Sequence, residues 1–377
     1  MTTIYLIRHA EAEGNLYRRL HGHYDSMVTA NGHKQIEALS RRFAGVQIHV
    51  CYSSDLTRTC QTAQAICKPQ RLRLRREPGF REIYCGAWED EPFGTLEYRE
   101  PEQMRRFSHD MWNWKVPGSE TFGQAVERFI QALRTVAENH PDQTVAIFTH
   151  GAILRAVQAE LFFTRETAKR SGHCDNTGVT RLTYEAGKFT LDYLNDNSHL
   201  DESISTLARQ SWWRSQGGTS SRDYNLRFEN ASDDGALYMD LRGQNWRQRC
   251  GIVQWLDERR VEIQMRQILK DAPHCLYYGF LGDVLVGTLL VEADNSLDYG
   301  VIHYLGVLPE RQNRGFAVQL LGQAVSHCRA RGKSKLRILI PNGDYATARF
   351  FEKHGFAPRK AGTGGQWYEM SIALPKV

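Results

Sequence analysis

The sequence lacks close cysteine pairs and long apolar runs, and these absences argue against several classes of protein. Its eight cysteines are scattered from Cys51 to Cys328 without a CxxC pair, which is atypical of a disulfide framework or a dithiol redox motif. No apolar run approaches the length needed to cross a bilayer, and no leader precedes the first apolar run, at residues 4–7. We therefore expect a reduced, cytoplasmic protein with no membrane partner.

Concentrated positive charge is also missing. The formal net charge is only +5, and no block rich in lysine and arginine stands out with aromatic residues interleaved, as a nucleic-acid footprint would require. The sequence also has no internal repeat and no long low-complexity tract. Nucleic acid is thus not an expected partner, and the mild positive charge fits pockets for small phosphorylated ligands.

The length of the chain and its pattern of apolar and polar residues predict two domains. A chain of 377 residues is too long for one compact core. Up to about His199, short apolar runs alternate with amphipathic stretches, as in α/β proteins whose helices pack on a mostly parallel sheet. Residues 214–223 (RSQGGTSSRD) are rich in Gly and Ser and have no apolar period, which is typical of a linker. We predict domains at 1–205 and 224–377, joined by a linker at 206–223.

Local signals predict several of the elements. Thr29 is expected to cap one helix, and Asp55 a second helix, at their N-termini. After the linker, residues 274–292 predict a hairpin around Gly282, and a further helix is expected to begin near Gly315. The strands predicted in the first half are residues 4–7, 46–52, 145–148 and 179–184.

Two apolar runs of the first half each end in a histidine. Leu-Ile-Arg8-His9 closes the first run and Ile-Phe-Thr-His150 closes the later one. Ligands of open α/β sheets bind beyond the carboxyl ends of the strands, so both histidines are expected to face one crevice. A lone histidine at such a place more often forms a local cap. Here Arg8 adds a cation, and Gly151 lets backbone approach a ligand, which together predict an anion site.

Two further segments offer groups suited to an anion. Residues 53–64 (SSDLTRTCQTAQ) place Arg58 in the first turn of a helix, where free N–H groups and the positive end of the helix dipole favour negative charge. Residues 80–90 (FREIYCGAWED) supply the carboxyl group of Glu82. Taken alone, Arg58 would also fit a solvated surface, and Glu82 would better fit a solvated turn.

Taken in order, LIRHAEAEGN, SSDLTRTCQTA, REIYCGAWED and FTHG resemble the histidine phosphatase family, also called phosphoglycerate-mutase-like, through about residue 200. The resemblance implies an α/β fold with three αβα layers and a small phosphorylated metabolite as substrate, without a metal or cofactor. It implies that His9 is the nucleophile and Glu82 the general acid. The remaining implied site residues are Arg8, Arg58 and His150 as the phosphate clamp, and Asn15, Gly22 and Gly151 as further phosphate or substrate contacts.

The roles that the resemblance assigns to these side chains are chemically consistent with one another. A transferring phosphoryl group spreads negative charge over three oxygens, so cationic side chains supply most of the stabilisation. A neutral imidazole can attack phosphorus to form a covalent phosphohistidine, which water then hydrolyses. Glu82, kept protonated in a desolvated pocket, would protonate the leaving alkoxide.

The chain departs from the family pattern at two places. Ala10 replaces the usual glycine after the nucleophile, and His21 replaces a glutamine near the rim of the pocket, where His23 adds a second titratable group. The segment between Glu82 and His150 looks shorter than in mutases, which favours hydrolysis and leaves a mutase as the alternative. Within it, residues 110–122 (DMWNWKVPGSETF) are expected to form part of a lid. Trp112 and Trp114 either contact substrate or pack inside this lid.

After the linker, a second phosphate cradle is predicted. Residues 305–321 (LGVLPERQNRGFAVQLL) pass from a strand through an arginine-rich turn into a helix, an arrangement that forms an anion nest. With NGDYATARFFEKHGF at 342–356, this segment resembles the GNAT acyltransferases over about residues 224–375. The resemblance implies an α+β domain that takes acetyl-CoA or another acyl-CoA. The implied cofactor-binding residues are Val307, Gln312, Asn313, Arg314, Gly315, Phe316, Ala317 and Asn342.

The acyl-transfer chemistry of this half stays open at the sequence level. The family often protonates the departing thiolate through a tyrosine, and that position is occupied here by Phe351, which cannot donate a proton. Either Tyr345 or a water takes the role, or the domain only binds acyl-CoA as a sensor. Candidate bases for an unknown amine acceptor are Glu292 and His303. We expect a bifunctional protein, with the sensor as the alternative for its second half.

Overall fold

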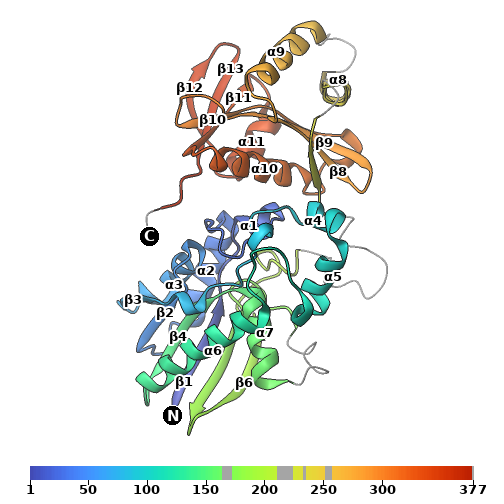
Figure 1. Ribbon diagram of the computed structural model, residues 1–377. Helices are drawn as coiled ribbons and strands as arrows, with labels where there is room; N and C mark the ends of the chain where they lie inside the picture. Colours follow the sequence, from blue (N-terminus) through green and yellow to red (C-terminus); the bar gives the residue numbers. More distant parts are fainter. Residues whose placement is uncertain (164–171, 210–223, 232–234, 251–256, 376–377) are drawn as a thin grey trace.

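The computed structural model describes residues 1–163, 172–209, 224–231, 235–250 and 257–375. These residues form two β-sheets that lie one above the other along the long axis of the molecule, each with its own helices (Figure 1). The first sheet is built from residues up to Asp196 and the second from Arg227 onward. No helix of the described residues is both long and apolar enough to traverse a bilayer.

The first sheet has six strands in the order β3-β2-β4-β1-β5-β6. The four strands from β3 to β1 run parallel, whereas β5 and β6 are antiparallel to their neighbours. The strands are β1 (Thr2–Arg8), β2 (Val50–Ser53), β3 (Leu74–Arg76), β4 (Thr144–Thr149), β5 (Val179–Glu185) and β6 (Lys188–Asp196).

Helices cover both faces of this sheet. Alternate residues of a strand point to opposite faces, so Ile4 and Leu6 of β1 pack into one core cluster while Tyr5 and Ile7 pack into the other. The first cluster includes α6 (Phe122–Asn139) and α7 (Gly151–Phe162), and the second α2 (Ala30–Arg42) and α3 (Thr57–Cys67). The predicted three-layer αβα fold is thus confirmed. The shorter helices are α1 (Glu13–Tyr17), α4 (Phe93–Arg99) and α5 (Pro101–His109).

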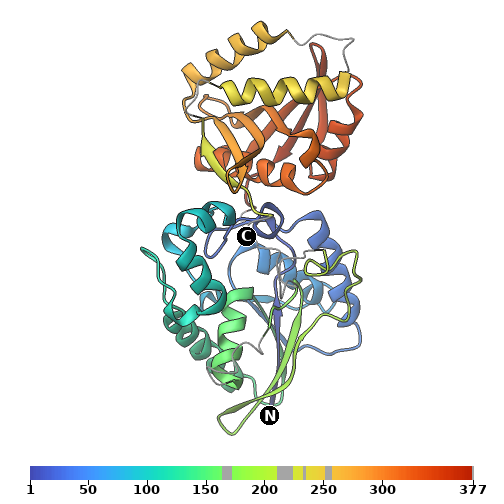
Figure 2. The same ribbon diagram turned by 90° about the vertical axis from the view of Figure 1, so that its right-hand side faces the viewer.

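The second sheet has seven strands in the order β12-β13-β11-β10-β9-β8-β7. Only β10 and β11 run parallel, and they pair over residues 299–302 and 335–338 alone. The predicted α+β domain is confirmed (Figure 2). The strands are β7 (Arg227–Asn230), β8 (Leu276–Leu281), β9 (Val284–Glu292), β10 (Tyr299–Val307), β11 (Lys335–Pro341), β12 (Ala357–Gly362) and β13 (Gly365–Ser371). The helices are α8 (Ala236–Cys250), α9 (Glu258–Asp271), α10 (Phe316–Ala330) and α11 (Tyr345–Lys353).

Several local predictions hold, one is wrong and one is only partly right. The Thr29 side chain caps α2 by accepting a hydrogen bond from the Gly32 N–H at 3.0 Å. The hairpin predicted at 274–292 is present as β8 and β9, and its turn places Gly282 at φ +60°, a conformation that favours glycine. Asp55 does not cap α3, because its carboxylate instead pairs with Arg81 at 2.5 Å. The strand predicted at 46–52 begins only at residue 50.

The described start of the predicted linker packs on the first sheet's half of the molecule. Thr206 is 4% exposed, and its hydroxyl donates to Glu11 Oε2 at 3.1 Å. Gln35 Nε2 in turn donates to Thr206 Oγ1 at 2.9 Å. Residues 210–223 of the predicted linker lie outside the described residues.

The two halves share a buried contact between α1 and α10. Tyr17 of α1 is 5% exposed and belongs to the core cluster of the second half. A Cβ atom at Gly322 of α10 would lie 2.4 Å from the Tyr17 Cβ atom, so only glycine allows this approach. The two halves are therefore joined by packing as well as by the chain.

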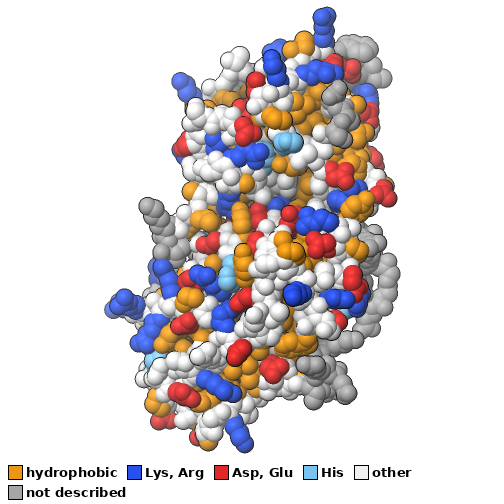
Figure 3. All heavy atoms as spheres, viewed as in Figure 1, with side chains coloured by type: hydrophobic (Ala, Val, Ile, Leu, Met, Phe, Trp, Pro, Cys, Tyr) orange, Lys and Arg blue, Asp and Glu red, His pale blue; other side chains and the backbone are white. Residues whose placement is uncertain are grey.

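On the face shown in Figure 3, acidic and basic side chains are interspersed rather than gathered by sign.

Candidate active site

His9 lies directly after β1 and is 6% exposed. Its Nδ1 atom is 2.7 Å from the carbonyl oxygen of Ala10. A carbonyl can only accept, so this contact places the ring proton on Nδ1 and leaves Nε2 with a free lone pair. Burial lowers the pKa of His9 well below its usual value of 6.5, and the charges of Arg58 and Arg8 lower it further. The ring is therefore neutral at neutral pH, as a nucleophile must be.

The structure brings His150 next to His9. The two ring centroids are 5.3 Å apart, and His150 is fully buried at the end of β4. Its Nε2 lies 2.9 Å from the hydroxyl oxygen of Ser54, which follows β2. Burial, followed by the charge of Arg58 and the nearby His9, lowers the pKa of His150 well below its usual value. No sequence motif singled out Ser54, although its place after a buried strand was a usable signal.

Arg58 is buried in the first turn of α3, with 1% of its surface exposed. Its guanidinium donates to the carbonyl oxygens of Gly22 at 2.7 Å, Tyr24 at 3.0 Å and His21 at 3.4 Å. All three acceptors belong to the loop that follows α1. The position of that loop therefore sets where the charge of Arg58 lies.

Arg8 supplies the second cation. Its Nη1 donates to the carbonyl of Cys174 at 2.5 Å, and its buried Nε has no hydrogen-bond partner among the described residues. A Cβ atom at Gly151 would lie 2.8 Å from this Nε. An unpartnered buried donor on a charged side chain is costly unless an anion completes its bonding, so this orphaned N–H fits a phosphate ligand.

Asn15 and Gly22 both make structural contacts near His9 and Glu82. The Asn15 Oδ1 atom accepts from the N–H of Ala12 at 3.1 Å and from Asn176 Nδ2 at 3.3 Å. Asn176 Nδ2 also donates to the His9 carbonyl at 2.9 Å, a link that the sequence analysis missed. A Cβ at Gly22 would meet the Ile83 carbonyl oxygen at 2.3 Å, so Gly22 serves close backbone packing. Phosphate contact by either residue stays a prediction.

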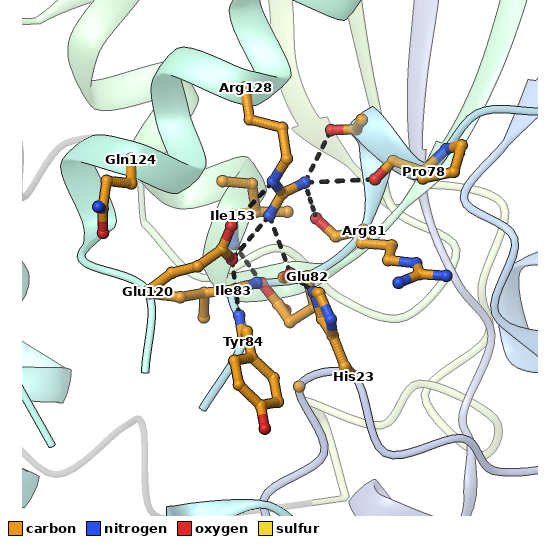
Figure 4. A network of polar contacts seen from close by, with 12 residues as sticks. His23, Pro78, Arg81, Glu82, Ile83, Tyr84, Glu120, Gln124, Arg128 and Ile153 are labelled. Atoms are coloured by element: carbon orange, nitrogen blue, oxygen red, sulfur yellow. Dashed lines mark hydrogen bonds and ion pairs between the residues drawn. The ribbon is translucent and has the colours of Figure 1, made fainter. Parts of the chain in front are cut away.

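Three backbone N–H groups fix the position of Glu82, and Ile83 and Ile153, which supply two of them, are labelled in Figure 4. Its carboxylate is 7% exposed and accepts from the N–H groups of Ile83 at 3.0 Å, Ala152 at 2.9 Å and Ile153 at 2.7 Å. The last two donors belong to the first turn of α7, which His150 caps. We expected Glu82 to be held protonated in its pocket. The three bonds fix the orientation of the carboxylate, and its role as general acid stays a prediction.

Arg128 and Glu120 clamp the segment that carries Glu82, as Figure 4 shows. Arg128 of α6 pairs with Glu120 at 2.9 Å and donates to the carbonyls of Gly79 at 2.9 Å and Glu82 at 3.2 Å. Glu120 Oε2 accepts from the Tyr84 N–H at 2.9 Å. No sequence pattern pointed to this clamp, because its members lie up to 50 residues apart.

The lid residue Trp114 and the rim residue His21 are more buried than expected. Trp114 is 1% exposed and packs edge-on against Trp88 and Phe107, so the alternative of lid packing is confirmed for it. Trp112 packs against the same core cluster and is partly buried. The His21 side chain is 6% exposed and donates from Nε2 to Asp90 at 2.9 Å. His21 therefore lies beneath the surface and not at a solvent-exposed rim.

In the second half, the loop before α10 forms the predicted cradle. Gly315 caps α10 with φ +82° and Asn313 has φ +61°, and both values favour a concave run of N–H groups. Among the described residues, none accepts a hydrogen bond from the N–H groups of Asn313, Arg314 or Gly315. These donors, with the first-turn N–H groups of α10, fit the pyrophosphate of an acyl-CoA.

Two further features suit a long amide-bearing ligand. β10 and β11 continue to Val307 and Pro341, although their pairing ends at Ile302 and Ile338, so the backbone between them is open to a ligand. The Gln312 side chain donates to the Val307 carbonyl at 3.2 Å and so braces the cradle rather than facing it. The N–H of Asn342, after β11, lies 3.4 Å from the Gly364 carbonyl.

The candidate acyl-transfer residues separate into two groups. Glu292 and His303 form a pair with 2.9 Å between Oε2 and Nε2, at a register shift of β10 where its pairing with β11 ends. Phe351 is 2% exposed and packs against Phe356 in the core, so it lines no solvent-filled site. Tyr345 is 72% exposed at the start of α11, which gives no support to its predicted role as proton donor.

Comparison with known proteins finds a family match for each half of the chain. Residues 4–197, about half of the chain, match the model of the histidine phosphatase superfamily (branch 1). The chain belongs to the histidine phosphatase superfamily. Residues 241–356 match the acetyltransferase (GNAT) family, so a GNAT domain follows the phosphatase-like domain.

The individual relatives named here each cover about half of this chain. "Metal-independent phosphoserine phosphatase" of Arabidopsis thaliana is 30% identical over 215 residues, which are 55% of this chain and 87% of that protein. "Probable phosphoglycerate mutase GpmB" of Proteus mirabilis (strain HI4320) is 28% identical over 207 residues, 54% of this chain and 96% of that protein. The solved structure "Bacillus stearothermophilus YhfR" has a TM-score of 0.51 at 26% identity, covering 53% of this chain and 99% of that one.

Among the residues that the structure describes, there is no group of three or more His, Cys, Asp or Glu side chains that could hold a metal ion. The site is instead built from two histidines, two arginines and one carboxylate. Imidazole and guanidinium groups of this kind suit phosphoryl chemistry.

The protonation of His9 in this superfamily member can be observed directly. Because burial and two arginines lower its pKa, we expect His9 to remain a neutral Nδ1–H tautomer at pH 6, below the usual histidine midpoint. Protonation, and with it loss of the nucleophile, should begin only at lower pH. Ring-nitrogen NMR of labelled protein, assigned by the signal missing from a His9→Ala variant, measures this. A midpoint at or above 6.5 contradicts the expectation.

Gly151→Ala tests whether Arg8 needs the space above α7. The added Cβ would lie 2.8 Å from Arg8 Nε and displace the guanidinium, so we expect kcat/KM for a phosphomonoester to fall by about tenfold or more. Gly123→Ala is the matched control, since its Cβ meets only a Thr121 oxygen at 3.8 Å near the start of α6. Equal activity of both variants would show that Arg8 tolerates the methyl group.

Proposed function

We propose that the first domain hydrolyses small phosphomonoesters without a metal, through a phosphohistidine on His9. The observation that carries the proposal is the His9 ring, whose Nδ1–H is fixed on the Ala10 carbonyl and whose Nε2 is free. Around it lie His150, Arg8 and Arg58. This arrangement joins a neutral nucleophile to the cationic groups that stabilise a transferring phosphoryl group.

The reaction proceeds in two displacements. Nε2 of His9 attacks phosphorus while the bond to the ester oxygen breaks, and the departing alkoxide takes a proton from Glu82. Water then attacks the phosphohistidine and gives its proton to the Glu82 carboxylate, which releases inorganic phosphate and restores both side chains. The N–H groups of Ile83, Ala152 and Ile153 hold the carboxylate between the two proton transfers.

Hydrolysis is favoured over isomerisation by the segment between Glu82 and His150. Trp114 and its aromatic neighbours pack inward there, which suits a compact cover over the site rather than an extended one that shields a phosphoenzyme from water. The relatives carry names of both kinds, phosphoserine phosphatase and probable phosphoglycerate mutase. A phosphorylated amino or hydroxy acid is therefore the first substrate class to try.

The test is phosphate release across a panel of phosphomonoesters that includes phosphoserine and a phosphoglycerate, with a chelator present throughout. Rapid acid-free quenching should trap a phosphoenzyme that is stable in base and labile in acid, as a phosphohistidine is. Release of phosphate supports the hydrolase. Interconversion of phosphoglycerate isomers without net release would support the mutase instead. If the protein catalyses neither reaction, the proposal is contradicted.

We propose further that the GNAT domain transfers an acetyl group from acetyl-CoA to an amine that is not yet identified. The bound thioester supplies an activated acyl group. The N–H groups from Asn313 to Ala317 would hold the pyrophosphate, and the Glu292–His303 pair would take the proton from the attacking amine. The pair lies where β10 leaves β11, which is the observation that supports transfer.

The buried Phe351 supports the alternative of an acyl-CoA sensor, and one assay separates the two readings. Free thiol released from acetyl-CoA is measured across a panel of amines, beside calorimetric binding of CoA. Thiol release that is lost in Glu292→Gln, with CoA binding kept, supports catalysis. CoA binding without thiol release from any amine supports the sensor. The cytoplasmic location expected from the cysteine pattern stays a prediction.

A further inference from the structure

One face of α10 is polar, yet it is turned toward the phosphatase domain. Leu320, Leu321, Ala324, Val325 and Cys328 pack into the core of the GNAT domain. Residues three or four apart share a face of a helix, and the face that contacts the other domain consists of Gly322, Gln323, Ser326 and Arg329. The polar groups of this face therefore form hydrogen bonds with the phosphatase domain rather than with water.

Arg329 forms the most buried ion pair of this contact. Its Nη1 and Nη2 atoms lie 2.7 and 2.9 Å from the two carboxylate oxygens of Glu13, and the two side chains are 11% and 8% exposed. Glu13 Oε2 also accepts from the N–H of Met27 at 3.1 Å. The pair thus fixes both ends of the loop of residues 12–27, which we call the substrate loop.

Ser326 fixes the middle of the substrate loop through Asp90. The Ser326 hydroxyl donates to Asp90 Oδ2 at 2.6 Å, and the other oxygen of Asp90 accepts from Arg19 Nε at 2.7 Å and from His21 Nε2 at 2.9 Å. Arg19 also donates to Gln323 Oε1 at 2.8 Å. Two residues of the substrate loop are thereby bound to the polar face of α10.

The substrate loop in turn sets the phosphate clamp. The three carbonyls that accept from Arg58 lie within it, at residues 21, 22 and 24. Asn15 of the same loop contacts Asn176, which holds the backbone of His9. A continuous series of buried polar contacts therefore runs from α10 to the catalytic groups, each step at hydrogen-bond distance.

We propose that the GNAT domain positions the phosphate clamp of the phosphatase, with Arg329 and Ser326 of α10 as positioning residues for phosphomonoester hydrolysis. The inference rests on the proposed phosphatase activity for its kinetic readout, although phosphate binding reports on it independently. A displaced Arg58 weakens contact with the phosphoryl group, so the effect should fall mainly on KM. The acyl-CoA cradle lies at the opposite end of the 15-residue helix and should be unaffected.

The experiment compares Arg329→Gln, Arg329→Lys and Ser326→Ala with wild type in the full chain. Removing Arg329 leaves the Glu13 carboxylate buried and unpaired, so we expect Arg329→Gln to raise KM and the Kd of inorganic phosphate by about tenfold or more. Lysine keeps the charge but not the paired geometry and should recover part of the loss. Arg331→Gln is the matched control, because Arg331 pairs with Asp294 inside the GNAT domain at 2.8 Å.

The readouts distinguish positioning from general damage. Calorimetric binding of CoA and the thermal midpoint report whether each variant is folded. Glu13→Gln combined with Arg329→Gln removes the unpaired charge and should cost less than the two single changes added together. Should Arg329→Gln fail to fold, Ser326→Ala, which removes only a hydroxyl, carries the test with a smaller expected rise in KM.

Folded variants whose KM and phosphate Kd equal those of wild type would overturn the inference. An equal loss in Arg331→Gln would also overturn it, since the effect would then be general to the domain. A wild-type protein that binds phosphate but releases none from any ester would contradict the proposed function alone. In that case the phosphate Kd of Arg329→Gln still decides the inference.

Discussion

Phosphate release from every phosphomonoester is expected to fall by about four orders of magnitude or more when His9 is replaced by alanine. Loss of a covalent nucleophile removes the route through the phosphoenzyme, and comparable removals in other enzymes cost factors of this size. His9→Ala should still bind inorganic phosphate, because Arg8, Arg58 and His150 keep their backbone and hydroxyl anchors. Initial rates and calorimetric phosphate binding together measure this.

His33→Ala serves as the control for that experiment. His33 is an exposed histidine of α2, so its removal should change neither phosphate release nor phosphate binding. A His9→Ala protein that kept more than a few per cent of wild-type activity would contradict the phosphohistidine route. Loss of phosphate binding together with activity would show that the variant had disrupted the site and not only its nucleophile.

Glu82→Gln is expected to slow hydrolysis of alkyl phosphates by about 10²- to 10⁴-fold, the range in which general acids contribute. The loss should be much smaller for p-nitrophenyl phosphate, whose phenolate departs without needing a proton. The amide of glutamine also presents N–H groups to the three backbone donors around residue 82, so some loss of stability is expected as well. Values of kcat/KM for the two kinds of ester, measured on one preparation, give the contrast.

The interpretation of Glu82 depends on that contrast and not on the size of either loss. Equal losses for alkyl and p-nitrophenyl esters would indicate that Glu82 only holds the first turn of α7. Glu37→Gln, an exposed carboxylate of α2, is the matched control and should leave both rates unchanged. The thermal midpoint separates the structural cost of Glu82→Gln from its effect on proton transfer.

The groups around His9 were predictable because short sequence patterns fix them. Apolar strands that end in His9 and His150 lead to one edge of a parallel sheet, and a helix that begins near residue 57 puts Arg58 in its first turn. In these cases a local rule, either strand order or helix capping, is enough to place the side chain. The same holds for Gly315, whose left-handed backbone follows from its place before α10.

Other features depend on partners that are distant in the sequence. Asp55 had the right spacing for a helix cap, but Arg81 competes for it from 26 residues away. The Arg128 clamp and the contact of Asn176 with His9 arise only when separate segments meet in the fold. The polar face of α10 is covered by another domain rather than by water, and nothing in the spacing of its residues indicates which of the two covers it.

The burial of Tyr17 in the core of the neighbouring domain has a practical consequence for dissecting the protein. A fragment that ended at residue 209 would leave Tyr17 and Leu16 of α1 without the apolar partners they have in the intact chain. The complementary fragment would expose a cleft beside Gly322 and an arginine deprived of Glu13. Either piece expressed alone would therefore be prone to aggregate, and both halves should be produced together as one folding unit.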